Sequence, residues 1–162
     1  MFGRRKKALV GAGAKAPSFR LAGMDGSTRT LEDILAGGPA LLAFFKISCP
    51  VCQLSAPYLE RLAANKTLQV VGISQDDAGA TRSFLERFGV TFSTLLDLGS
   101  EDYPASNAYG ITSVPSLFLL ERDGTVSRSF NGFSKRDFEE MGMRAGVSPF
   151  GPDDHVPEWK AG

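Results

Sequence analysis

Apolar and polar residues follow one another along the chain in blocks that predict alternating strands and helices. Residues 40–45 and 68–74 are apolar runs bounded by turn-forming residues, as is typical of central strands buried on both faces. Each run is followed by residues with helical spacing. Residues 50–64 place Cys52, Leu59 and Leu62 on one face, and residues 77–88 direct Phe84 inward.

The rest of the pattern extends this order on both sides. A hairpin is predicted over residues 18–30, a short helix over 31–35, a strand over 92–97 and a short helix over 104–109. Strands over 115–121 and 126–130 form a second hairpin, and Ser134 caps a last helix that ends near Arg144. We therefore predict an α/β fold, with a mixed sheet that has helices on both faces.

Length and charge narrow the function classes. The chain has 162 residues, of which 43% are hydrophobic and 22% charged, as expected of one folded domain. Lys plus Arg and Asp plus Glu both total 18, so the basic surplus that nucleic acid binding needs is missing. No apolar run approaches the roughly 18 residues of a membrane span. We expect neither nucleic acid nor a membrane span.

The two ends of the chain differ in composition from the central region. Residues 1–15 are basic and Gly/Ala-rich and predict a flexible arm, 16–147 the domain, and 148–162 a Pro-rich tail. Arg4–Lys7 and the apolar stretch after it imitate a signal peptide, but the stretch is short and contains two glycines. We expect a cytoplasmic protein, with a periplasmic or membrane-associated one as the alternative. The tail is expected to lie away from the active site, the alternative being a lid over the cysteines that Trp159 anchors.

The candidate chemistry lies in Cys49-Pro50-Val51-Cys52, between a buried strand and a helix. At a helix start, free amide groups and the helix dipole stabilise a thiolate on Cys49. Cys52 lies one turn further on, where it can bond Cys49 while the core shields it. Pro50 suits the first helical turn because it lacks an N–H. A structural metal site needs four ligands, and only His155 in the tail adds to the two cysteines, so we expect no metal.

More distant residues extend the motif into a resemblance. Pro57 follows Cys49 by eight residues, residues 16–26 lead into the first hairpin and through its turn, and residues 109–119 contain Pro115 at a strand start. Over residues 16–144 the chain resembles the thioredoxin superfamily, most closely its TlpA/ResA branch within the AhpC/TSA-like redoxin group. The resemblance implies a thioredoxin-like fold and a thiol–disulfide oxidoreductase. Such an enzyme exchanges its dithiol with protein or peptide disulfides, using no cofactor beyond the Cys49–Cys52 disulfide and an unidentified electron donor or acceptor.

The resemblance also implies roles for single residues. Pro115 is expected to be cis beside the disulfide and to leave the Val114 backbone free to pair with substrate, as in strand addition. Ser48 and Pro50 flank Cys49 and are expected to contact substrate. The branch carries a glutamate after the next strand, and Asp76 is the candidate there for handling a proton. The alternative is that Asp76 and its neighbour only begin the following helix.

The sequence departs from the thioredoxin pattern at two positions, and two other functions are alternatives to a thiol–disulfide oxidoreductase. Thioredoxins have a buried aspartate where this chain has Ala43, and a tryptophan where it has Ser48. A peroxiredoxin needs Thr or Ser three residues, and Pro seven residues, before its reactive cysteine. Lys46 and Leu42 stand there for Cys49, and Cys49 and Phe45 for Cys52, so neither register fits. A thioredoxin-fold binding module with an incidental disulfide is the other alternative, and the intact cysteine pair speaks against it.

Overall fold

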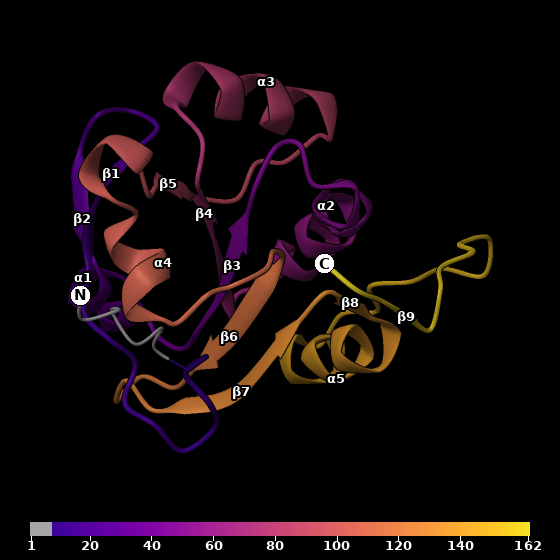
Figure 1. Cartoon of the computed structure of the whole chain (residues 1–162). Helices are drawn as coiled ribbons and strands as arrows, with labels where there is room; N and C mark the ends of the chain where they lie inside the picture. Colours follow the sequence, from indigo (N-terminus) through magenta and orange to yellow (C-terminus); the bar gives the residue numbers. More distant parts are fainter. Residues whose placement is uncertain (1–7) are drawn as a thin grey trace.

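The computed structural model describes residues 8–162, so the basic cluster Arg4–Lys7 lies outside the described residues. A seven-stranded sheet runs through the molecule in the order β2-β1-β5-β4-β3-β6-β7, with helices packed against it (Figure 1). The strands are β1 (Arg20–Gly23), β2 (Thr28–Thr30), β3 (Ala40–Phe45), β4 (Gln69–Ser74), β5 (Thr94–Leu96), β6 (Ser116–Leu120) and β7 (Val126–Asn131). The helices are α1 (Leu31–Ala36), α2 (Pro50–Ala63), α3 (Ala78–Arg87), the 3₁₀ turn η1 (Gly99–Glu101), α4 (Pro104–Ala108) and α5 (Lys135–Ala145).

Strand β3 is the centre of the sheet because all six of its residues are apolar and buried. It pairs parallel with β4 and antiparallel with β6. Its side chains alternate between two core clusters. Leu42 and Phe44 pack with residues of α1 and α4, whereas Leu41 and Ala43 pack with residues of α2 and α5. Helices therefore cover both faces, and the predicted α/β mixed sheet is confirmed.

Antiparallel hairpins close the two edges of this sheet. The pair β6–β7 forms one edge, as the hairpin predicted from the strands over residues 115–121 and 126–130 implies. At the other edge β1 pairs with β2 and also with β5, so the first hairpin joins the sheet beside the parallel strands. The parallel strands β3, β4 and β5 all end at the same side of the sheet, and the residues that follow them converge there.

The described part of the predicted flexible arm, residues 8–15, packs against the domain. Val10 N–H donates to the carbonyl of Tyr109 at 3.1 Å, and Gly13 N–H donates to that of Val126 at 2.8 Å. Gly110 adopts a positive φ of 71°, and a Cβ there would lie 2.1 Å from the carbonyl oxygen of Ala8. Long-range backbone pairing thus holds residues 8–15 against the domain, although their own composition specifies no structure.

The tail also packs against the domain, and the prediction that it lies away from the active site is wrong, because a Cβ on Gly162 would lie 2.2 Å from the carbonyl oxygen of Val114. The Phe150 ring lies 5.0 Å from that of Tyr58 on α2, and Arg61 forms an ion pair with Asp154. The chain then returns as β9 (Trp159–Lys160), which pairs antiparallel with β8 (Phe133–Ser134) (Figure 1). The alternative of a lid anchored by Trp159 is also wrong in that detail, because 62% of the Trp159 surface is exposed.

Candidate active site

The cysteine pair lies where β3 leads into α2. Cys49 is the N-cap of α2, and its Sγ accepts the N–H of Cys52 at 3.1 Å. Pro50 occupies the first turn, where its missing N–H leaves no hydrogen bond unmade. Both cysteines are free thiols, Cys49 partly exposed and Cys52 only 3% exposed. One sulfur therefore faces solvent at the helix start while the other is shielded one turn later.

The burial of Cys52 sets its protonation. Removal from water raises the pKa of the Cys52 thiol far above its usual range, and the hydrogen bond with Cys49 raises it further. The negative charge of Asp76 acts in the same direction, whereas the Lys46 backbone opposes it. Cys52 is therefore a neutral thiol at physiological pH, and it needs a proton acceptor before it can attack a disulfide.

The third part of the site comes from a distant segment of the chain. The Val114–Pro115 peptide bond is cis, as the resemblance implied, and Pro115 is buried at the start of β6. Cys49 Sγ donates to the carbonyl oxygen of Val114 at 3.3 Å. The Ser116 hydroxyl donates to the carbonyl of Ser113 at 2.7 Å and so fixes the turn. The fold thus brings the loop before β6 into contact with the first cysteine.

Asp76 faces the cysteine loop rather than the helix that follows it. Its Oδ2 accepts the N–H of Ile47 at 2.8 Å, and its own N–H donates to Ser74 Oγ at 3.1 Å. Asp77 is the N-cap of α3, because its Oδ1 accepts the N–H of Ala80 at 2.8 Å. The interpretation as a helix cap therefore applies to Asp77, and the Asp76 carboxylate lies where its charge acts on Cys52.

The other residues that the sequence singled out lie either at the surface or in the core. Ser48 and Pro50 are exposed beside Cys49, and Lys46 is exposed as well. Ala43 is 1% exposed and lies opposite Gly72 in β4, where a Cβ would meet the Phe92 ring at 3.0 Å. The centre of β3 beneath the cysteines is thus closely packed and apolar, and Asp76 reaches the cysteine loop from the end of β4 instead.

Two supporting residues were missed by the sequence analysis. Gln53 on α2 donates from Nε2 to the carbonyl of Ile47 at 3.0 Å, across the loop that carries Cys49. Asp97 is fully buried, and its carboxylate accepts the N–H of Ala105 at 2.9 Å and the N–H of Ser106 at 2.8 Å. It thereby fixes α4, which leads into the loop before Pro115. For Asp97 the available signal was a charged residue at the end of the strand predicted over residues 92–97.

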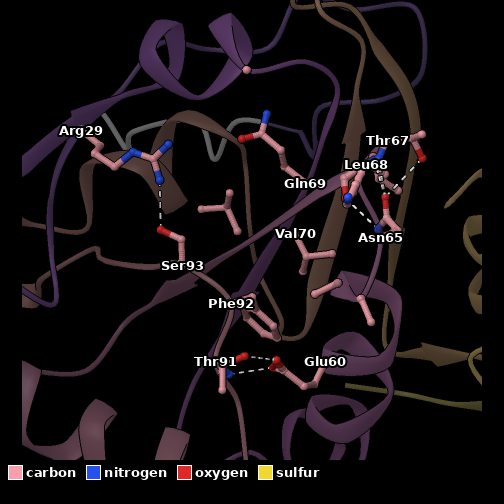
Figure 2. A pocket seen from close by; sticks show the side chains of 15 residues that line it. Arg29, Glu60, Asn65, Thr67, Leu68, Gln69, Val70, Thr91, Phe92 and Ser93 are labelled. Carbon is pink, nitrogen blue, oxygen red and sulfur yellow. Dashed lines mark hydrogen bonds between the residues drawn. The ribbon is translucent and has the colours of Figure 1, made fainter.

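A cavity with a volume of about 450 Å³ lies away from the cysteines (Figure 2). It opens beside the start of β4, at the end of the parallel strands opposite to the cysteine loop. Its polar side chains bind one another, as Figure 2 shows for Arg29 with Ser93 and for Glu60 with Thr91. None of the predicted site residues lines it.

Within residues 8–162, no group of three or more His, Cys, Asp or Glu side chains is arranged to hold a metal ion. In the same part of the chain, no helix is both long enough and apolar enough to cross a membrane.

Comparison with known proteins gives consistent matches. The Redoxin family model matches residues 11–146. The thiol-disulfide oxidoreductase ResA of Geobacillus thermodenitrificans is 30% identical over 140 residues, which cover 83% of this chain and 78% of that protein. Among solved structures, a thiol:disulfide interchange protein of the DsbE type from Chlorobium tepidum is 29% identical, with a TM-score of 0.73 over 85% of this chain and 99% of its own. A secreted Mycobacterium tuberculosis disulfide oxidoreductase is 26% identical, with a TM-score of 0.64 over 78% of this chain and 95% of its own.

Proposed function

The chain belongs to the Redoxin family and is a thiol–disulfide oxidoreductase. We propose that Cys49 attacks protein or peptide disulfides and that Cys52 resolves the mixed disulfide that forms. The observation that carries this assignment is the asymmetry of the two thiols. Cys49 is partly exposed at the N-terminus of α2, and its sulfur accepts an amide hydrogen bond. Cys52 is buried, and its pKa is raised.

In the first step the Cys49 thiolate attacks one sulfur of the substrate disulfide. A new bond forms between Cys49 and that sulfur, the substrate bond breaks, and the other substrate sulfur leaves as a thiolate that takes a proton from water. The N–H of Cys52, 3.1 Å from Cys49 Sγ, stabilises the attacking thiolate. The positive end of the α2 dipole has the same effect.

In the second step Cys52 attacks Cys49 and releases the second substrate thiol. The Cys52 proton must leave first, because burial favours the neutral thiol. Asp76 is our candidate for the acceptor, since its carboxylate lies on the cysteine loop and is held there by Ile47 N–H. The enzyme ends with a Cys49–Cys52 disulfide, and the substrate gains two electrons and two protons. The reverse sequence oxidises a dithiol substrate.

Substrate binding is expected at the loop before β6. An extended peptide can pair with the Val114 backbone by strand addition, which places its disulfide over Cys49, while Ser48 and Pro50 form the exposed rim. The chemistry requires no cofactor besides the cysteine pair, although it requires a second partner that returns the pair to its starting redox state. That partner is a dithiol or disulfide protein of unidentified sequence.

The direction of electron flow depends on the compartment. In the cytoplasm, which is the expectation from the sequence, reduction of substrates would be favoured. The similarity to a secreted mycobacterial oxidoreductase supports the alternative of an extracytoplasmic enzyme. Fractionation of the source cells, with the protein detected by antibody, distinguishes the two.

Trapping of the intermediate tests the proposed roles. Cys52→Ser should accumulate a mixed disulfide between Cys49 and a peptide disulfide, and Cys49→Ser should accumulate none, as read by intact mass. The unaltered protein should reduce insulin, whereas neither variant should complete a catalytic cycle. Trapping by Cys49→Ser alone would reverse the assignment, and failure of the unaltered chain to reduce insulin would favour a binding module.

A further inference from the structure

The last described residues of the chain lie against the proposed substrate-binding loop. A Cβ added to Gly162 would lie 2.2 Å from the carbonyl oxygen of Val114 and 3.3 Å from Pro115 Cδ. A Cβ added to Gly132 would lie 2.3 Å from the carbonyl oxygen of Lys160. Residues 160–162 therefore lie between Gly132 and Val114, whose carbonyl oxygen also accepts a hydrogen bond from Cys49 Sγ. We call residues 159–162 the strap.

The strap and an extended substrate compete for the same space. A peptide that pairs with Val114 runs about 4.8 Å from it, the usual spacing of neighbouring strands. Gly162 already lies in contact with the Val114 carbonyl oxygen, with no room for a single methyl group between them. A substrate strand on this side of Val114 can therefore dock only after the strap has moved.

The strap is held weakly compared with the segment before it. Its pairing with β8 covers two residues on each strand, and Trp159 remains largely exposed, so little apolar surface is buried. The segment before it is anchored by the Phe150 ring against Tyr58 and by the ion pair of Arg61 with Asp154. Residues 159–162 can thus detach while the preceding segment stays docked.

We propose that the strap determines substrate specificity by covering the Val114 backbone. Small disulfides reach the partly exposed Cys49 with the strap in place, whereas an extended peptide disulfide must displace the strap first. This inference rests on the proposed binding of substrate at Val114.

Gly162→Ala tests the proposal in the full chain, because its methyl group would clash with Val114. Gly151→Ala is the matched control, since its methyl would meet only Asp154 Oδ2, at an ordinary 3.4 Å. We would measure the rate constants of Cys49 with hydroxyethyl disulfide and with a linear peptide disulfide. Gly162→Ala should raise the peptide rate about tenfold, equivalent to about 1.4 kcal/mol. The hydroxyethyl rate should stay within about twofold.

A chain shortened after Glu158 provides a second variant and should show the same selective gain. An unchanged or lowered ratio of the peptide rate to the hydroxyethyl rate in both variants would overturn the strap. Failure of the unaltered chain to react with hydroxyethyl disulfide would instead contradict the proposed function and, with it, the inference.

Trp159 gives an independent readout, because it is the only tryptophan in the chain. A peptide trapped on Cys49 of the Cys52→Ser protein should lower the emission anisotropy of Trp159, since the strap is released. A trapped hydroxyethyl group should leave the anisotropy unchanged. Equal anisotropy in the free and the peptide-loaded protein would show that the strap stays in place and would refute the proposal.

Discussion

Asp76→Asn separates two roles of the Asp76 carboxylate that have opposite consequences. If Asp76 acts only through its charge, its removal lowers the pKa of Cys52, because the negative charge raises that pKa. More Cys52 thiolate would form at neutral pH, and the mixed disulfide would resolve faster. If Asp76 accepts the Cys52 proton, the same substitution slows resolution. The sign of the change therefore identifies the role.

We predict the slower outcome. Loss of a general base costs about 10²-fold or more in rate. The opposing gain in thiolate is smaller, because burial, the largest cause of the raised pKa of Cys52, is unchanged. The fold should survive, since an asparagine oxygen can still accept the N–H of Ile47, which Asp76 binds at 2.8 Å. Exchanging a charged for a neutral acceptor costs about 1 kcal/mol of stability.

A chromogenic disulfide, dithiobis(nitrobenzoate), measures both steps in one stopped-flow trace. Attack by Cys49 releases the first thionitrobenzoate, and resolution by Cys52 releases the second. Asp76→Asn should slow only the second phase. Asp77→Asn is the matched control, because Asn caps a helix as well as Asp and should leave both phases unchanged. A second phase of Asp76→Asn that is equal to or faster than that of the parent would refute the reasoning.

Three further predictions concern stability. The pKa of Cys52 is higher in the folded than in the unfolded protein, so its contribution to stability is complete below the pKa of the unfolded thiol and is lost above it. Above about pH 9 the free energy of unfolding of the reduced protein should therefore fall relative to that of the oxidised protein, by up to about 1.4 kcal/mol per pH unit. Parallel pH curves would contradict this. Asp97→Asn should cost about 2–3 kcal/mol in urea unfolding, because the carboxylate of Asp97 accepts backbone N–H groups of α4 inside the core. An unchanged urea midpoint would show that these bonds contribute nothing. Arg61→Met should cost less than about 1 kcal/mol, since the ion pair with Asp154 is partly exposed, yet it should speed proteolytic cleavage between residues 151 and 157. Equal cleavage rates would mean that the tail is held elsewhere.

The sheet and the cysteine loop could be predicted because local patterns determine them. The apolar run of β3 has one stable position in a sheet, the centre, and Cys49 and Pro50 mark the start of the next helix. Asp76 could be placed near the cysteines for a related reason. It follows β4 as Ile47 follows β3, and parallel neighbours end at the same edge of the sheet.

The packing of the two ends could not be predicted in this way. Trp159 and Lys160 show no periodicity, and their pairing with β8, like the contact of Phe150 with Tyr58, joins residues distant in sequence. Pro-rich composition predicts a loose tail because it reports only local preferences. Val10 illustrates the same limit at the other end, since its partner is the Tyr109 carbonyl.

A redox titration of the full chain tests most directly whether Cys49 and Cys52 form one reversible redox centre. The protein would be equilibrated with mixtures of reduced and oxidised dithiothreitol, alkylated, and analysed by peptide mass. We predict a single two-electron transition in which both thiols disappear together and a Cys49–Cys52 linked peptide appears. Loss of Cys49 alone, or a disulfide that joins two chains, would contradict the account.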